Sequence, residues 1–222
     1  MRVHILRLGA FGAAVATLAG HRLAAAGHAV TGGDVTVTPH AAPAFWPPSD
    51  LCVLVAGRPS PYLEGVLDRS VVDSGTPAAT VVVEHPRLRL GPLVDGTAAC
   101  LGCLHVRRAQ HDGAHAKVAP LLQAYDRDPS LEPRGHLPLH VALAVTWLER
   151  LTQQLAAGTA GAGRVTHLNL HTGASGSDRI VGVHGCPRCR TTPPLADSTW
   201  RGLATDLVGV GGVGASRGGD RG

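Results

Sequence analysis

Cys100-Leu-Gly-Cys103 and Cys186-Pro-Arg-Cys189 are two Cys-x-x-Cys segments, separated by the 82 residues 104–185. Each segment turns tightly enough to offer two thiolates to one tetrahedral Zn²⁺, and together they complete a closed shell of four sulfurs. A shell without an open position is structural. The separation exceeds that of compact zinc fingers, so the metal closes a domain and does not create a small fold. The sequence therefore predicts one zinc ion, held by Cys100, Cys103, Cys186 and Cys189.

Two other interpretations of these cysteines stay open. The pairs are either unrelated and buried, or one of them is a redox motif of the thioredoxin kind beside a coincidental second pair. A redox pair needs only one motif at the start of a helix, so the shared metal site is favoured. Cys52, the fifth cysteine, lies in the apolar run 51–55 and is predicted to be a buried strand residue. Cysteines kept as thiolates for a metal suit a reducing compartment, so we expect a cytoplasmic protein.

The composition favours one α/β domain. The chain has 222 residues, of which 44% are hydrophobic and only 3% aromatic, so its core must consist mainly of Val, Leu and Ala. The net charge of +4 comes from scattered Arg and Lys without an aromatic stacking platform, which argues against a nucleic-acid partner. No apolar run is long enough to cross a bilayer, so no membrane partner is expected.

The N-terminal residues have the outline of a dinucleotide-binding turn. A short strand at 2–6 precedes Gly9 and Gly12 and a helix that extends to about residue 26. The first glycine of a Gly-x-Gly-x-x-Gly turn would fall at position 7, where Arg7 stands. Gly9 and Gly12 thus form a degenerate glycine turn that packs without nucleotide, and no cofactor-binding residue is assigned. A signal peptide is disfavoured, because its removal would delete this first strand.

Alternating strand and helix patterns predict a mainly parallel, wound sheet with helices on both faces. The predicted strands are 29–38, with a turn or bulge at Gly32-Gly33, and then 51–56, 78–84 and 87–94; the predicted helices are 61–72, 118–125 and 139–157, whereas 105–115 is polar and basic. The Leu and Trp stripe of the last helix indicates a core or dimer face. A hairpin of residues 165–171 and 179–184, turning at 173–177, leaves the sheet and leads to the second cysteine pair. Residues 1–190 form the domain, and the Pro/Gly-rich residues 191–222 are predicted to be a disordered tail.

The region around the first cysteine pair resembles a known family. Gly91-Pro-Leu-Val-Asp-Gly-Thr-Ala-Ala-Cys100-Leu-Gly-Cys103-Leu-His105, followed by Arg107-Arg108, a helix and the late Cys-Pro-Arg-Cys, is similar to the ThiF-type fold of the ubiquitin-activating enzymes. Within that fold, it most resembles the ThiF-like cyclodehydratase partners, or leader-peptide-binding proteins, of thiazole/oxazole-modified peptides in actinobacteria. The resemblance covers residues 1 to about 190. The implied fold class is α/β, a Rossmann-like ThiF-type sheet with a zinc-clasped helix and hairpin.

The resemblance implies a partner role in the biosynthesis of ribosomally made, modified peptides. In that family, the ThiF-like protein engages the leader of a precursor peptide and presents it to a YcaO-type enzyme, which uses ATP to convert Cys, Ser or Thr into azolines. The leader-grasping module of that family lies N-terminal to the ThiF-like part, whereas this sequence begins at the first strand. A leader would then be held by another protein or by another surface. ThiF-like domains commonly pair, which makes a homodimer an expectation.

The enzymatic branch of the fold adenylates a carboxylate, which requires glycines around a phosphate and an acidic residue for Mg²⁺. Here Arg7 replaces the first glycine, and Gly57-Arg-Pro-Ser60 stands where the aspartate after strand 51–56 is expected. Asp34 is the only acidic candidate at the end of the second strand. We therefore expect no catalytic residues and no ATP cofactor. The alternatives are an active adenylyltransferase and a zinc-stabilised structural protein outside peptide modification.

Overall fold

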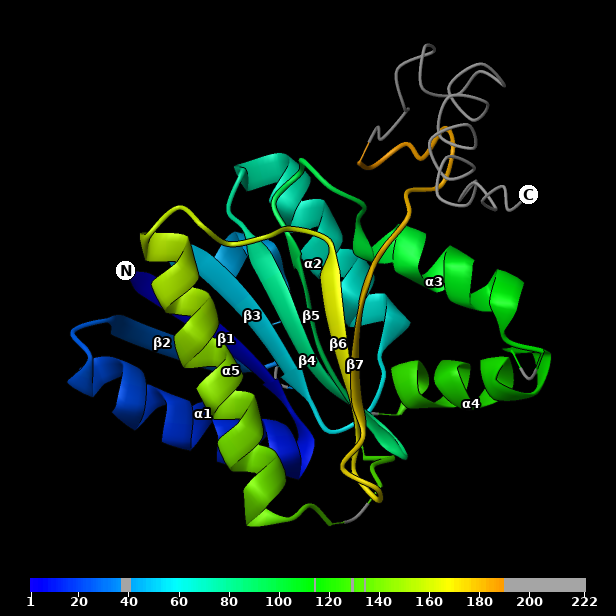
Figure 1. Ribbon diagram of the computed structural model, residues 1–222, viewed down its shortest axis with the longest axis horizontal. Helices are drawn as coiled ribbons and strands as arrows, with labels where there is room; N and C mark the ends of the chain where they lie inside the picture. The colour runs from blue at the N-terminus through cyan, green and yellow to red at the C-terminus, as the bar shows by residue number, and fades with distance from the viewer. Residues whose placement is uncertain (37–40, 114, 129, 134, 190–222) are drawn as a thin grey trace, which may run out of the picture.

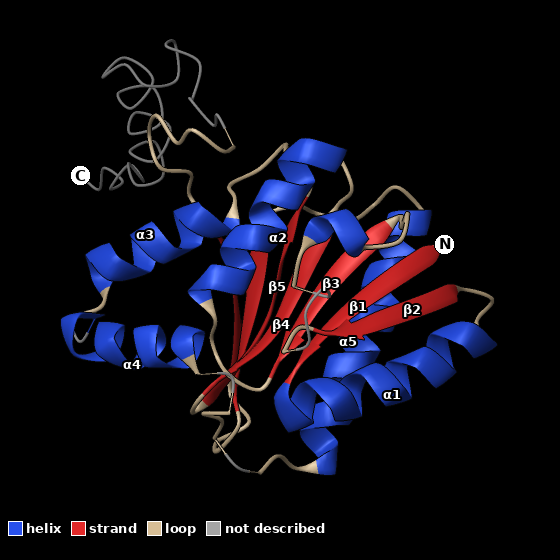
Figure 2. Cartoon of the chain, turned by 180° about the vertical axis from the view of Figure 1, so that it is seen from behind, coloured by secondary structure: helices blue, strands red, loops and turns tan. Residues whose placement is uncertain are grey.

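The computed structural model describes residues 1–36, 41–113, 115–128, 130–133 and 135–189, which form one sheet covered by helices on both faces (Figures 1 and 2). The strands, in the sheet order β2-β1-β3-β4-β5-β6-β7, are β1 (Arg2–Leu8), β2 (Ala29–Asp34), β3 (Leu51–Ala56), β4 (Ala78–Glu84), β5 (Arg87–Val94), β6 (Arg164–Asn169) and β7 (Ser175–Arg179). The helices are α1 (Gly9–Ala25), α2 (Pro61–Ser74), α3 (Leu101–His111), α4 (His115–Arg127) and α5 (Pro138–Ala156), with a 3-10 turn η1 (Pro43–Phe45). The predicted α/β class with helices on both faces is confirmed, and the predicted tail 191–222 lies outside the described residues.

The sheet is mixed, so the prediction of a mainly parallel sheet is right only for its N-terminal half. Strand β1 lies between β2 and β3 in parallel pairing, and β3 pairs in parallel with β4. The remaining pairs, β4 with β5, β5 with β6, and β6 with β7, are antiparallel. Only His85 and Pro86 join β4 to β5, which is too short for the crossover that a parallel neighbour needs.

The hairpin of β6 and β7 was predicted to leave the sheet, and this is wrong. Strand β6 pairs with β5, so the hairpin extends the sheet, and β7 spans Ser175–Arg179 instead of 179–184. All five residues of β7 are exposed, so no buried face imposes an apolar alternation on its sequence. Two further predictions differ. Helix α3 replaces the polar segment 105–115, and Gly32-Gly33 pair in register with Ile5 and Leu6 without a bulge.

Two hydrophobic cores lie on the two faces of the sheet. Helices α1 and α5 pack against each other on one face, and α2 and α3 cover the other (Figures 1 and 2). Strand β3 is buried at every residue because its alternate side chains enter both cores. In α5, Leu148 and Leu151 are buried, whereas Leu139 and Leu143 of the predicted stripe are exposed, so the stripe is only partly core. None of the helices in the described residues combines the length and apolar content that crossing a bilayer requires.

A network of buried ion pairs lies on the face of the sheet that α2 and α3 cover. Arg89 of β5 is fully buried and donates to Glu64 of α2 at 2.5 Å, to Glu84 of β4 at 2.7 Å, and to Thr80 at 2.8 Å. Arg108 of α3 reaches the same Glu84 oxygen at 2.6 Å. One guanidinium therefore joins two strands to α2, and its acceptor Glu84 extends the network to α3.

The two carboxylates of this network stay charged. Burial raises the pKa of Glu84, but Arg89 and Arg108 lower it further, to about 2. Burial likewise raises the pKa of Glu64, and Arg89 and His105 outweigh it, so the net shift is downward. These ion pairs determine how the elements pack, because removal of one partner would leave the other charge buried without a counter-charge.

We expect Arg89→Met to destabilise the protein by about 3–5 kcal/mol, since Glu64 would remain buried without its guanidinium. The double variant Arg89→Met/Glu64→Leu should recover part of this loss, because both charges are then removed. Urea unfolding measures the free energies. As a control, Arg2→Met breaks the exposed Arg2–Asp50 pair and should cost less than about 1 kcal/mol. A double variant as unstable as the single one would contradict the assignment.

Candidate functional site

The structure brings the four predicted cysteines into one cluster. Cys100 and Cys103 lie at the start of α3 and are buried, whereas Cys186 and Cys189 lie in the turns after β7 and are half-buried. The sulfur atoms are 3.8 Å apart for Cys100 and Cys103, 3.7 Å for Cys100 and Cys186, and 3.5 Å for Cys103 and Cys189. All four sulfurs lie within 4.8 Å of one another, close enough to hold a metal ion. This arrangement excludes two unrelated pairs.

The sulfur separations fit tetrahedral metal coordination. A tetrahedron with Zn–S bonds of about 2.3 Å has edges of about 3.8 Å, which matches the 3.5–3.8 Å observed. A disulfide would require about 2.05 Å between the two sulfurs. Burial also raises the pKa of the Cys100 and Cys103 thiols, whereas a redox Cys-x-x-Cys requires a lowered pKa. A metal ligand must also be a thiolate, so the raised pKa values do not separate the two roles. The tetrahedral spacing of all four sulfurs is what favours metal ligation over a single redox pair.

Asp68 of α2 links the two cysteine pairs and was not predicted. Its buried carboxylate accepts the backbone N–H groups of Leu101 and Gly102, both at 2.9 Å, and thereby caps the start of α3. The same carboxylate lies 3.2 Å from the guanidinium of Arg188, which stands between Cys186 and Cys189. Gly102 leaves the space for this contact, since a Cβ there would lie 3.1 Å from Arg188.

A second candidate site lies at the carboxyl ends of the parallel strands. Helix α1 connects β1 to β2, and the chain then returns to β3 on the other side of β1, so the connection reverses between β1 and β3. In open α/β sheets, ligands bind in the crevice at such a reversal. Here, the start of α1 at Gly9 and the residue after β3, Gly57, border the crevice.

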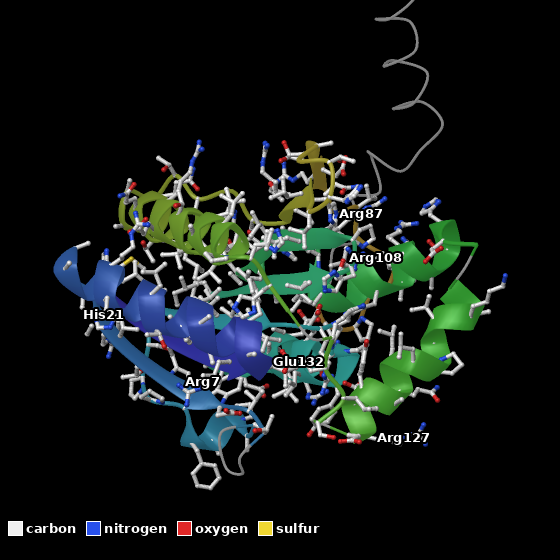
Figure 3. The ribbon with its side chains drawn as sticks, turned by 90° about the horizontal axis from the view of Figure 1, so that it is seen from below. Arg7, His21, Arg87, Arg108, Arg127 and Glu132 are labelled. Carbon is white, nitrogen blue, oxygen red and sulfur yellow. The ribbon has the colours of Figure 1, made fainter. Side chains whose placement is uncertain are left out.

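The carboxylate of Glu132 already lies in this crevice. Its Oε1 accepts the backbone N–H of Ala10 at 2.8 Å, at the start of α1. Gly9 has a φ of +75°, and a Cβ there would collide with Glu132; a Cβ at Gly57 would lie 2.6 Å from the same oxygen. Figure 3 shows Glu132 beside the start of α1, which is also the end of the helix nearer to Arg7. Gly9 and Gly57 therefore leave room for the carboxylate of Glu132 at the N-terminus of the helix.

The space left beside Glu132 is small. A cavity of about 230 Å³ remains, with Phe11, His85 and His136 in its wall. Pockets that hold small molecules usually measure about 300–1,000 Å³. With Glu132 in this position, the space that remains in the crevice lies below this range.

The other residues singled out at this edge have separate explanations. Gly12 packs α1 against β3, because a Cβ there would lie 2.5 Å from the carbonyl oxygen of Val55. Asp34 is the last residue of β2, so an acidic residue does end that strand. Its carboxylate lies 3.8 Å from Arg7 and accepts the Thr36 hydroxyl at 2.6 Å. Asp34 is thus placed where a ribose contact would be made in a dinucleotide-binding fold.

Neither a family model nor a curated protein matches this sequence. Solved structures do match its fold. A heterocyclase in complex with substrate and cofactor is 21% identical, with a TM-score of 0.58, over 85% of this chain and 25% of its own. The McbBCD microcin synthetase complex of E. coli gives 14% identity and a TM-score of 0.56, over 83% of this chain and 67% of the matched chain. E. coli MccB, solved together with MccA, gives 14% identity and a TM-score of 0.58, over 85% and 66%.

This chain spans about a quarter of the heterocyclase and about two thirds of the two E. coli chains. Identities of 14–21% establish a shared fold. The ThiF-like resemblance seen in the sequence is thereby confirmed at the level of the fold, which this chain shares with structures described as a heterocyclase, a microcin synthetase and MccB.

Proposed function

We propose that this protein is a non-adenylating, zinc-binding partner of a YcaO-type cyclodehydratase in the biosynthesis of thiazole/oxazole-modified peptides. The observation that carries the proposal is Glu132, whose carboxylate accepts the Ala10 N–H at the start of α1, the position where dinucleotide-binding folds hold a phosphate. A triphosphate would meet this negative charge at close range and would lose the helix N-terminus that normally stabilises it. The likeness to structures described as a heterocyclase and a microcin synthetase supports the pathway.

Zinc in this proposal is structural. Four thiolates would complete its shell and leave no position for substrate or water, so the ion would supply cross-linking between α3 and the segment after β7. Asp68 and Arg188 would hold the two ligand pairs in register, as outer-shell groups commonly do in metal sites. The domain would then extend from residue 1 to about 190.

One observation favours a second candidate, an active adenylyltransferase. Asp34 ends β2, where a dinucleotide-binding fold places its ribose ligand. Adenylation also requires a site for the triphosphate and its metal. Glu132 fills that site, and Arg58, which is buried, follows Gly57 where a metal-binding aspartate is expected. The partner role is therefore the better supported of the two.

We expect the purified protein to contain about one zinc ion per chain, measured by elemental mass spectrometry. Cys100→Ser should lose the metal and lower the melting temperature, because binding energy in a structural site is folding energy. Cys52→Ser is the matched control, since Cys52 is buried in β3 outside the cluster. It should keep the metal. Metal-free wild-type protein, purified under reducing conditions in zinc-supplemented buffer, would contradict the site.

Wild-type protein should show no saturable ATP binding by calorimetry and no ATP–pyrophosphate exchange. Glu132→Ala frees the Ala10 N–H and should gain weak ATP binding without gaining exchange, because no carboxylate replaces the missing metal ligand. Glu149→Ala removes a carboxylate of α5 that pairs with Arg22 of α1, and it should leave nucleotide binding unchanged. Exchange by the wild type would support the adenylyltransferase instead.

The partner role predicts that a tagged chain captures a YcaO-type enzyme from the native host. In a reconstituted reaction with that enzyme, ATP and the precursor peptide, addition of the chain should increase azoline formation, which mass spectrometry detects as loss of water. Capture without any effect on azoline formation, or no capture at all, would refute this role.

A further inference from the structure

The outer edge of the sheet is open to a further strand. Within the described residues, β7 pairs only with β6 and lies at the end of the strand order (Figure 1). All five of its residues are exposed. Its first three residues, Ser175 to Ser177, are small and include no proline. An exposed edge strand presents unpaired backbone N–H and C=O groups, to which an extended peptide can add.

A groove runs beside this strand, between α3 and the β6–β7 hairpin. Its volume is about 480 Å³, within the range of sites that bind ligands. The floor is apolar, with buried Leu104 and Val165 next to Ile180 and Val181. Val181 is 68% exposed and therefore offers apolar surface that a partner can cover. The floor can therefore bury apolar side chains of a bound segment.

The rim of the groove is basic. Arg107, Arg108 and Arg179 line it together with His111, and Asp178 is the only acidic residue among the lining residues. Arg108 is committed to Glu84, but Arg179 and His111 are exposed, and no ion pair of either is found within the described residues. Figure 3 shows Arg87 of β5 on the same side of the molecule as Arg108. The surface therefore complements a negatively charged partner.

Contacts around the cysteine cluster preform this groove. Arg107 of α3 donates to the carbonyls of Val181 at 3.2 Å and Gly182 at 2.9 Å, which holds the segment after β7 against the helix. The next residue, Val183, donates its N–H to the sulfur of Cys103 at 3.3 Å. The strand edge, the apolar floor and the basic rim are thus fixed relative to one another before any partner arrives, which lowers the entropic cost of binding.

We propose that this groove, formed by α3 and the β6–β7 hairpin, binds an extended acidic peptide that adds a strand to β7 and buries apolar side chains on the floor. The proposal rests on the proposed function, because it specifies where a peptide of that pathway docks. Charge argues for a separate peptide. Residues 190–222 carry four arginines and three aspartates, and a second copy would bring the same basic rim.

A fluorescent ten-residue peptide of alternating Glu and Val tests this site by anisotropy, with a peptide of alternating Lys and Val as its counterpart. The Glu peptide should bind at least about tenfold more tightly. The double variant Arg179→Glu/His111→Glu should weaken its binding by about tenfold or more. Arg150→Glu, an exposed arginine on α5 outside the groove, is the matched control and should leave binding unchanged.

Strand addition has its own signature. Hydrogen exchange should slow in residues 175–183 when the Glu peptide is added, and N-methylation of alternate peptide nitrogens should abolish binding. Equal affinity for both peptides, an unaffected double variant that retains its fold by circular dichroism, or protection elsewhere would overturn the site. Dimerisation through β7, seen by size-exclusion chromatography, would also overturn it. If the YcaO-type enzyme is captured but the probe does not bind, only the docking site fails; if the probe binds but no enzyme is captured, only the proposed function fails.

Discussion

The carboxylate of Asp68 is the contact on which the two ends of the candidate metal centre depend. It accepts hydrogen bonds from two backbone N–H groups at the start of α3, where Cys100 supplies no side-chain cap. It also pairs with Arg188, which lies between the second pair of cysteines. Buried charge of this kind is costly unless it is fully paired, and here backbone donors and one guanidinium share it. Helix α3 therefore starts in a fixed place, and the late cysteines can return to it.

The ion pairs around the buried Arg89 also hold α2 and α3 against the sheet. Its guanidinium spans Glu64 of α2 and Glu84 of β4, and Arg108 of α3 ends on Glu84. Apolar contacts alone allow helices to slide on a sheet. A shift that breaks this network would leave a buried charge unpaired and would therefore raise the free energy of the folded state. The position of α3 is thus determined twice, by ions within the core and by the cysteine cluster at its N-terminus. The groove beside β7 inherits that rigidity because α3 is one of its walls.

The sequence predicted what apolar periodicity and short spacing determine. Strands β3 and β4 were predicted with their observed bounds because mainly apolar runs mark strands that are buried on both faces. The bounds of β5 were also predicted, although Arg87 and Arg89 interrupt its apolar residues. Helix α3 was missed because its N-terminal turn coincides with the first cysteine pair and most of its surface is polar. Strand β7 was misplaced because an exposed edge has no buried face to pattern it. Asp68 and Glu132 escaped prediction because their partners are 33 and 122 residues distant in sequence. The only signal for Asp68 is its place in the predicted helix 61–72 between the apolar residues Leu67 and Val71.

The crevice at the carboxyl ends of the parallel strands and the groove beside β7 differ in how much open space they contain, and this difference bears on function. At the carboxyl ends of the parallel strands, the usual ligand position is closed by Glu132, and about 230 Å³ remains. At the antiparallel edge, an exposed strand, an apolar floor and uncommitted basic side chains surround about 480 Å³. A protein that had to hold a nucleotide would need the first edge open, whereas one that presents a peptide needs the second. In the proposed function, the antiparallel strands β5 to β7 would supply the surface for peptide recognition, whereas Glu132 occupies the crevice at the carboxyl ends of the parallel strands.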